Sequence, residues 1–322
     1  MIEVKHLTKR YGNLCAVSDL SFTIERGRIY GFLGPNGAGK STTMNIMTGC
    51  LAATSGEVKI GGFDIFEEAE QAKKLIGYLP EQPPLYPDRT PREYLAFVAR
   101  AKGIPEKQIA GQLTHVMTVT QTLDVADRLI KNLSKGYKQR IGIAQAILGD
   151  PEVIILDEPT VGLDPRQIIE IRDLIQELGK DHTVILSSHI LSEVQAVCQT
   201  ILIISKGRLA ACDSPENLEK RFAGTATVEL LAEATREEVD QILSDVKRVT
   251  SFNVQKTEDG CCSVRLEMPG QADKMACRDI FFAFSKAGRA ILQMNMAKAN
   301  LEDIFMELTQ NDEKEGHNES SF

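Results

Sequence analysis

A glycine-rich segment followed by a lysine and a serine constrains the fold of this chain most strongly. Residues 34–41 fit the pattern G-x-x-x-x-G-K-[ST], in which successive backbone N–H groups curl around a phosphate. Apolar residues 29–33 precede it and predict a strand, while residues 41–50 predict a helix. A strand, a glycine-rich turn and a helix N-terminus together favour an anion-binding loop in an α/β fold. We therefore expect the chain to bind a nucleoside triphosphate.

The chemistry of this loop assigns roles to its residues. The glycines permit positive φ angles, so the backbone can turn its N–H groups towards the anion. Lys40 is placed to reach the β- and γ-phosphates, and the Ser41 hydroxyl is placed to ligate Mg²⁺. The residues expected to hold the triphosphate are Gly34, Pro35, Asn36, Gly37, Ala38, Gly39, Lys40 and Ser41.

Strands and helices alternate over residues 1–221, which predicts an α/β domain with a mainly parallel sheet. Thr90, Pro91 and Glu93 supply an N-cap, a first-position proline and a capping-box glutamate, and so mark the start of one helix. The predicted strands are 1–7, 16–24, 29–33, 57–60, 153–156 and 183–186, and the predicted helices are 41–50, 90–102, 106–130, 135–148 and 165–178.

The pattern changes near residue 222. Segments of residues 225–295 follow the order β-α-β-β-α-β, which is typical of a ferredoxin-like α+β domain. A further helix is expected at 301–308, and the polar residues 310–322 predict a disordered tail. We therefore expect domains at 1–221 and 222–309, with the tail at 310–322.

Composition narrows the possible partners. The net charge of −8 argues against a general nucleic-acid binder. No apolar run approaches the roughly 18 residues of a membrane span. If the protein works at a membrane, we expect a separate chain to cross it.

A second motif consists of four apolar residues, Val153 to Leu156, followed by Asp157, Glu158 and Pro159. The apolar run predicts a buried strand, so both carboxylates stand at its C-terminal end, where ligands bind in open α/β sheets. Asp157 suits a Mg²⁺ ion carried by the nucleotide. Glu158 is then free to act as a general base that polarises the attacking water.

A third motif, residues 133–140, opens a helix with Ser134 and Gly136. These residues leave backbone amides exposed at the helix N-terminus, which predicts a second anion site. No ligand for it is evident in its own half of the chain. Taken alone, such a segment is more often an ordinary helix cap.

These motifs, with residues 162–165 and His189, resemble in order and spacing the ATP-binding subunit of an ABC transporter, over roughly residues 1–220. The resemblance implies a P-loop ABC-type nucleotide-binding domain with a helical subdomain at about 88–150. In that family the signature helix of one subunit closes on the γ-phosphate held by the P-loop of another. Two ATP molecules with Mg²⁺ would then lie between two head-to-tail subunits.

The resemblance also implies roles for single residues. Tyr11 would stack on adenine, although an isolated tyrosine is more often a surface aromatic. Thr42 would support Ser41 on the phosphate side. Ser134 and Gly136 would contact the γ-phosphate across the dimer.

Two further roles concern the hydrolysis step. Asp164 would lie in the loop that links the two nucleotide sites. His189 would orient the water and the γ-phosphate beside Glu158, although a lone histidine is more often simply solvated.

Two departures from the family pattern matter. Lys135 and Tyr137 replace the usual glycine and glutamine of the signature. Glu81 occupies the position where the family carries a glutamine, and a carboxylate can ligate Mg²⁺ but cannot donate a hydrogen bond to phosphate. Gln82 would take that role only if the register slips by one. Both departures resemble the subclass that powers ABC-2-type exporters of drugs or sodium and gliding-motility systems.

The expected function is therefore that of an ATP-hydrolysing subunit that powers export through a separate membrane-spanning permease. The subunit would form a homodimer, or pair with a second ATPase subunit, on the cytoplasmic face of the cell membrane, with no nucleic-acid partner. The alternative is a soluble ABC-type ATPase of translation or DNA repair. Such proteins usually carry two cassettes or a coiled-coil insertion, whereas this chain has one cassette and no heptad run.

Overall fold

A computed structural model describes residues 1–222, 225–244, 246, 249–257, 261–269, 274–297 and 305. The chain forms two compact units that divide between Pro215 and Glu216. Helix α8 (Pro215–Phe222) begins at this division and ends where the sequence placed its domain boundary. Apart from residue 305, the helix expected at 301–308 and the tail at 310–322 lie outside the described residues.

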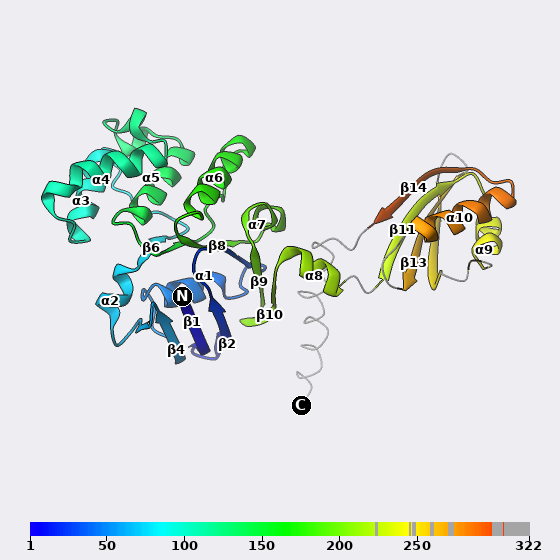
Figure 1. Ribbon diagram of the computed structural model, residues 1–322, viewed down its shortest axis with the longest axis horizontal. Coiled ribbons are helices and arrows are strands. Elements are labelled where there is room, and N and C mark those ends of the chain that lie inside the picture. Colours follow the sequence, from blue (N-terminus) through cyan, green and yellow to red (C-terminus); the bar gives the residue numbers. More distant parts are fainter. Residues whose placement is uncertain are drawn as a thin grey trace. The chain divides into compact units, whose positions relative to one another are not determined.

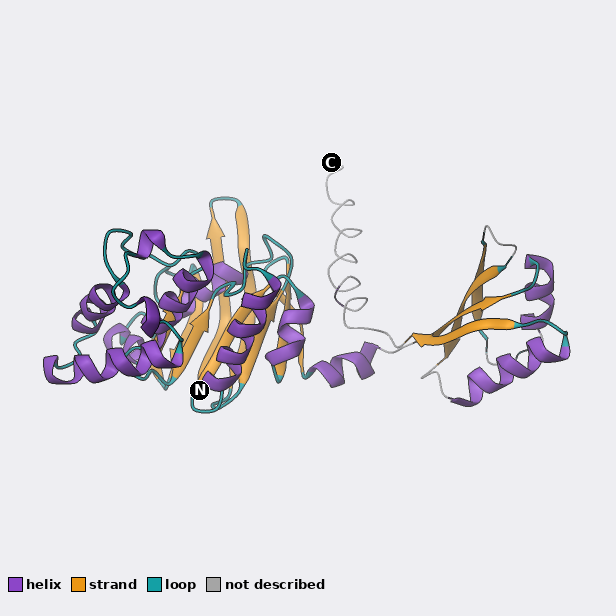
Figure 2. Cartoon of the chain, turned by 90° about the horizontal axis from the view of Figure 1, so that it is seen from above, coloured by secondary structure: helices purple, strands orange, loops and turns teal. Residues whose placement is uncertain are grey.

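A six-stranded sheet forms the centre of the first unit (Figures 1 and 2). Its strands run parallel except at one edge, where β10 is antiparallel to β9. The predicted mainly parallel sheet is therefore confirmed. The buried strands read as continuous apolar runs, as strands covered on both faces do. The order is β10 (Arg208–Asp213), β9 (Thr200–Ser205), β3 (Ile29–Leu33), β8 (Thr183–Ser188), β7 (Val153–Leu156) and β6 (Ile76–Leu79).

A second, antiparallel sheet packs near the first, with helix α1 (Lys40–Met47) in the core that they share. Phe22 and Phe32 join the two sheets edge to face, with ring centroids 5.3 Å apart. The strand order is β2 (Leu14–Ile24), β1 (Ile2–Tyr11), β4 (Ser55–Ile60) and β5 (Phe63–Asp64).

Three helices of the first unit pack on one another within the stretch predicted as a helical subdomain (Figure 1). They are α3 (Pro91–Ala101), α4 (Glu106–Val119) and α5 (Lys135–Ile147). The prediction of helix as far as residue 130 was wrong, because Gln121 adopts a φ of +53° and stops α4. Short 3₁₀ turns at Leu123–Val125 and Ile130–Asn132 follow.

Several elements gave no clear sequence signal. Strand β6 contains Gly77, and a Cβ there would lie 2.1 Å from the Ala146 carbonyl oxygen of α5. This close approach accounts for a glycine that interrupts the apolar run. Also unpredicted were β5, β9, β10, α2 (Ala69–Lys74), α7 (Leu191–Val197) and α8.

The second unit has the ferredoxin-like arrangement that the sequence predicted. Its antiparallel sheet has the order β12 (Ser251–Lys256), β13 (Cys262–Pro269), β11 (Thr225–Ala232) and β14 (Ile291–Ala297). Helices α9 (Arg236–Ser244) and α10 (Lys274–Lys286) contribute to one core with alternate residues of the strands. No helix within the described residues is both long and apolar enough to cross a membrane.

Candidate nucleotide-binding site

The glycine-rich loop joins β3 to α1 and has a backbone that only glycine allows at key points. Gly37 and Gly39 adopt φ angles of +82° and +103°. A Cβ on Gly34 would lie 2.4 Å from the Ile204 carbonyl oxygen, and one on Gly39 would lie 2.5 Å from that of Ala16. The loop is therefore a tight backbone cradle at a helix N-terminus, the arrangement that binds phosphate.

Lys40 folds back over this cradle. Its ammonium donates hydrogen bonds to the carbonyl oxygens of Gly34 at 2.8 Å and Pro35 at 3.2 Å. Beneath it, the N–H of Ala38 donates to the Pro35 carbonyl oxygen at 3.2 Å. A buried positive charge thus lies at the mouth of the loop, where a phosphate group would complete its hydrogen bonds.

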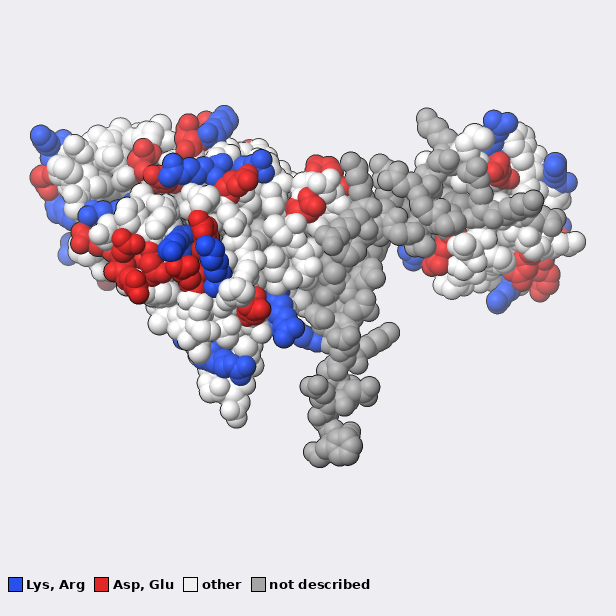
Figure 3. All heavy atoms as spheres, turned by 60° about the horizontal axis from the view of Figure 1, so that its bottom comes forward, with Lys and Arg blue, Asp and Glu red and all other residues white. Residues whose placement is uncertain are grey.

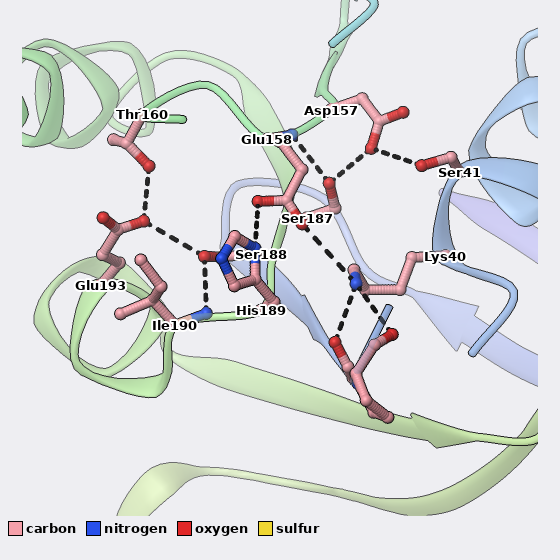
Figure 4. A network of polar contacts seen from close by, with 12 residues as sticks. Lys40, Ser41, Asp157, Glu158, Thr160, Ser187, Ser188, His189, Ile190 and Glu193 are labelled. Carbon is pink, nitrogen blue, oxygen red and sulfur yellow. Dashed lines mark hydrogen bonds and ion pairs between the residues drawn. The ribbon is translucent and has the colours of Figure 1, made fainter. Parts of the chain in front are cut away.

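Parallel register places Asp157 beside the loop, although 116 residues separate it from Ser41. Strands β7 and β8 pair Leu156 with Leu186, so Asp157 and Ser187 follow at the same sheet edge. The Ser187 hydroxyl donates to Asp157 Oδ1 at 2.6 Å, and the Ser41 hydroxyl donates to the same oxygen at 3.2 Å (Figure 4).

Glu158 is held between two nitrogen-bearing side chains (Figure 4). Its Oε1 lies 3.6 Å from the Lys40 ammonium, and its Oε2 lies 3.0 Å from His189 Nδ1. The Glu158 backbone has a φ of +48°, and its N–H donates to the Ser187 hydroxyl at 2.8 Å. A positive φ is unusual for glutamate. The hydrogen bond from the Glu158 N–H helps to hold this backbone conformation, and with it the position of the carboxylate.

Sequence reasoning missed the buried residues that support the two carboxylates. The Ser187 hydroxyl contacts the Asp157 carboxylate and the backbone N–H of Glu158, as described above. Glu193 accepts hydrogen bonds from the hydroxyls of Thr160 at 2.5 Å and Ser188 at 3.1 Å, which joins α7 to the loop after β7. One signal was available in the sequence: Ser187 and Ser188 directly follow the predicted strand 183–186, which was expected to lie in the same parallel sheet.

Burial raises the pKa of Tyr78 well above its ordinary value, and the nearby Asp157 carboxylate adds to the shift. The phenol therefore stays neutral over the physiological range. Its hydroxyl donates to Asn45 Oδ1 at 3.1 Å, which joins β6 to α1 behind the cleft.

A cleft of about 480 Å³ brings most of the predicted residues together. Its lining includes the loop residues and, from elsewhere in the chain, Tyr11, Glu81 and His189. The Tyr11 side chain is 48% exposed, and the Lys9 ammonium lies 5.1 Å from its ring centroid. The predicted residues that line the cleft are Tyr11, Asn36, Gly37, Gly39, Lys40, Ser41, Thr42, Glu81, Glu158 and His189.

Not every predicted residue is part of this lining. Gly34, Pro35, Ala38 and Asp157 lie in or beside the phosphate loop without lining the cleft, and Ser134, Gly136 and Gln82 are outside the lining too. Ser134 caps α5, where its hydroxyl accepts a hydrogen bond from the Tyr137 N–H at 3.4 Å. Gly136 is buried against the Gln167 side chain. Gln82 lines a neighbouring cavity instead, whereas Glu81 lines both, which favours Glu81 as the residue that faces the nucleotide.

Asp164 also lies apart from the cleft lining. It caps α6 (Pro165–Leu178), and its Oδ1 accepts a hydrogen bond from the Gln167 N–H at 2.9 Å.

The donor set fits a Mg²⁺ ion that arrives with a nucleotide. Ser41 and Asp157 present a hydroxyl and a carboxylate side by side. No group of three His, Cys, Asp or Glu side chains suited to a metal occurs among the described residues. Mg²⁺ in nucleotide sites typically takes one or two protein oxygens and completes its shell with phosphate oxygens and water, so two protein ligands suffice.

Comparison with known proteins identifies the family. The model of the ABC transporter family matches residues 17–161. The bacitracin transport ATP-binding protein BcrA of Bacillus licheniformis is 34% identical over 315 residues, which cover 96% of this chain and 97% of that protein.

Two solved structures are similar to about two thirds of this chain. The ATP-binding subunit of an ABC transporter has a TM-score of 0.63 at 30% identity, with 69% of this chain and 93% of that chain covered. The dimeric structure of MJ0796, a bacterial ABC transporter cassette, has a TM-score of 0.61 at 25% identity, with 66% and 98% covered. With BcrA matched along nearly its whole length, the chain belongs to the ABC transporter family, as an ATP-binding subunit of the ABC-2-type exporter class.

Proposed function

We propose that the chain binds ATP and Mg²⁺ in the cleft and hydrolyses ATP to power export through a separate membrane-spanning subunit. The observation that carries the proposal is the position of Glu158, fixed between Lys40 and His189 on the wall of a glycine-lined cleft. A carboxylate so placed can accept a proton from an attacking water. BcrA, by its name a bacitracin transport protein, supports the link to transport.

The side chains would divide the chemistry as follows. Lys40 and the loop amides would hold and neutralise the β- and γ-phosphates. Ser41 and Asp157, with Glu81 as a further oxygen, would hold Mg²⁺, which when bound screens the charge of the phosphates. Glu158 would take the proton of the attacking water while His189 keeps that carboxylate in position. Tyr11 would supply an aromatic surface for the base.

Dimerisation would complete the site. Ser134 and Gly136 lie outside the cleft lining of their own chain, so we propose that they contact the γ-phosphate bound to a second copy or a paired subunit. The dimeric MJ0796 cassette supports this arrangement. The loop at residues 81–92 would transmit the closing motion of the dimer to the membrane subunit. This chain would lie on the cytoplasmic side of the membrane.

Surface charge favours these partners over nucleic acid. On the face drawn in Figure 3, the described acidic and basic side chains are interspersed rather than gathered into one basic field. A protein that binds the phosphate backbone of DNA or RNA needs such a field. Together with the net charge of −8, the charge pattern of this face supports protein partners over nucleic acid.

Replacement of the base tests the proposal. We expect Glu158→Gln to lower kcat by roughly a hundredfold or more, because the amide cannot accept the proton. ATP should still bind, and an ATP-bound dimer should accumulate in size-exclusion chromatography. The exposed Glu177→Gln on α6 is the control and should behave as wild type. Wild-type turnover by Glu158→Gln would exclude this mechanism.

A further inference from the structure

One buried carboxylate near the cleft has no part in the proposed chemistry. Glu193 lies in the first turn of α7 and is 4% exposed, yet within the described part of the chain it makes no ion pair with a basic side chain. A carboxylate that is taken out of water needs hydrogen bonds to offset its lost hydration. The hydrogen bonds that the Glu193 carboxylate accepts come from two hydroxyls, those of Thr160 and Ser188. What these two hydroxyls hold in place therefore indicates what Glu193 does.

A single oxygen of Glu193 accepts both hydrogen bonds (Figure 4). The Thr160 hydroxyl lies 2.5 Å from Glu193 Oε2, and the Ser188 hydroxyl lies 3.1 Å from the same atom. A carboxylate oxygen has two lone pairs, so it can accept from both donors at once. Thr160 belongs to the loop after β7, whereas Ser188 is the last residue of β8. Glu193 Oε2 therefore joins two segments that follow neighbouring strands.

On the side of β7, this network reaches Glu158 through a turn. The Val161 N–H donates to the Glu158 carbonyl oxygen at 3.2 Å, which closes a turn over residues 158–161. Thr160 lies within this turn, and its side chain is buried. A displacement of Thr160 would therefore move the backbone that carries the Glu158 carboxylate.

On the side of β8, the network holds the backbone around His189. The Ser188 hydroxyl donates to Glu193, and it also accepts a hydrogen bond from the Ile190 N–H at 3.0 Å. The residues before and after His189 are thus joined through one hydroxyl. The His189 side chain is 38% exposed, so packing covers it only in part. A fixed backbone on both sides helps to keep the ring beside Glu158.

The two halves of the network converge on one contact. Glu158 Oε2 and His189 Nδ1, which belong to the two segments that Glu193 joins, lie 3.0 Å apart. A general base must lie within hydrogen-bond reach of the water that it deprotonates. A misplacement of about 1 Å in such a site can lower the rate by about a hundredfold. The separation of the two segments is therefore a quantity on which turnover depends.

We propose that Glu193 is a positioning residue for ATP hydrolysis, which acts through Thr160 and Ser188 to keep Glu158 and His189 in register. Glu193 does not line the cleft, so it has no contact with the nucleotide in this role. The role needs an acceptor oxygen rather than a charge, because both partners are hydroxyl donors. The role in hydrolysis rests on the proposed function, whereas the link between the two segments does not.

Variants of similar shape distinguish an acceptor from a charge. Glu193→Gln keeps an oxygen with two lone pairs, so we expect its kcat to stay within about twofold of wild type. Glu193→Leu and Thr160→Val each break the link, and should lower kcat by about tenfold while the KM for ATP stays within about twofold. The matched control is Thr120→Val, which removes another buried threonine hydroxyl, at the end of α4, and should leave kcat unchanged.

A double variant tests whether Glu193 acts through Glu158. In the Glu158→Gln background, Glu193→Leu should change the residual kcat by less than about twofold, because the base that it positions is already absent. A loss in that background as large as in wild type would contradict the proposal. Wild-type kcat in both Glu193→Leu and Thr160→Val would also contradict it, as would equal losses in Glu193→Gln and Glu193→Leu.

Hydrogen exchange measures the link without reference to turnover. We expect Glu193→Leu to speed exchange of the Val161 and Ile190 amides by about tenfold, and Thr120→Val to leave both amides as in wild type. Unchanged exchange at both amides in Glu193→Leu would refute the link, whether or not the protein hydrolyses ATP. Absence of turnover in the wild-type protein would refute the proposed function, and with it the role in hydrolysis, even where faster exchange supports the link.

Discussion

Ser187 links Asp157 and Glu158 through a single hydroxyl. Its hydroxyl donates to Asp157 and accepts from the Glu158 N–H, and its side chain is fully buried. One hydroxyl thus positions the expected Mg²⁺ ligand and fixes the strained backbone of the expected base. A hydroxyl is suited to this because it can donate and accept at the same time.

We expect Ser187→Ala to lower kcat by at least about tenfold while the affinity for ATP changes little, because the phosphate loop is untouched. The Glu158 N–H would lose its partner, which costs about 1–3 kcal/mol of local stability. Steady-state kinetics and hydrogen exchange of the amides at the ends of β7 and β8 would measure the two effects. Unchanged turnover together with unchanged protection would refute this role.

Two helices, one in each unit, begin with the same capping box. In α3 the Thr90 hydroxyl accepts from the Glu93 N–H at 3.2 Å, and Glu93 accepts from the Thr90 N–H at 3.0 Å. Thr235 and Glu238 repeat the pattern before α9, at 3.4 and 2.9 Å. Each box satisfies backbone donors that the helix itself cannot.

These caps provide a matched pair of variants. Thr90→Ala and Thr235→Ala should each destabilise their own unit by about 1 kcal/mol. Since the cleft lies in the first unit, Thr235→Ala should leave ATP turnover as in wild type. Hydrogen exchange resolved by unit is the appropriate measurement, because a two-unit chain need not unfold in one step. Equal loss of protection in both units for either variant would contradict independent folding.

Local signals determined which elements the sequence could predict. Strand β7, helix α5 and the capping box of α3 follow from short stretches of residues and were found correctly. The end of α4 was missed, because it depends on a left-handed Gln121 rather than on a proline or glycine. Strand β6 was missed because Gly77 interrupts its apolar run. The reason for this glycine is the close approach of the α5 backbone, which is distant in the sequence.

The same limit applies to the site. Motif spacing predicted the phosphate loop and both carboxylates. That the loop and the carboxylates lie side by side depends on the order of the strands in the sheet, which no local pattern encodes. Because β3, β8 and β7 are neighbours in the sheet, the hydroxyls of Ser41 and Ser187 both reach Asp157 Oδ1. The role of Ser187 could therefore be recognised only from the strand order in the structure.

The predicted site residues all lie in the first unit, yet one chain does not bring them together. Lys40 lines the cleft, whereas Ser134 stands at the start of α5 outside its lining. If the second half of the site comes from another copy, two different defects should compensate each other. A head-to-tail dimer has two equivalent composite sites, each built from the loop of one copy and the signature of the other.

We therefore expect Lys40→Ala and Ser134→Arg to be nearly inactive separately and active when mixed. In the mixed dimer, one site loses both groups while the other has an intact Lys40 and an intact Ser134. Random pairing makes half the dimers mixed, so ATP turnover should recover to about a quarter of the wild-type value. Turnover of the separate and mixed variants is the measurement, with Glu158→Gln mixed with Lys40→Ala as the control. That control should stay inactive, because the site with an intact loop lacks its base. Mixed dimers that form without recovering activity would place the whole site in one chain.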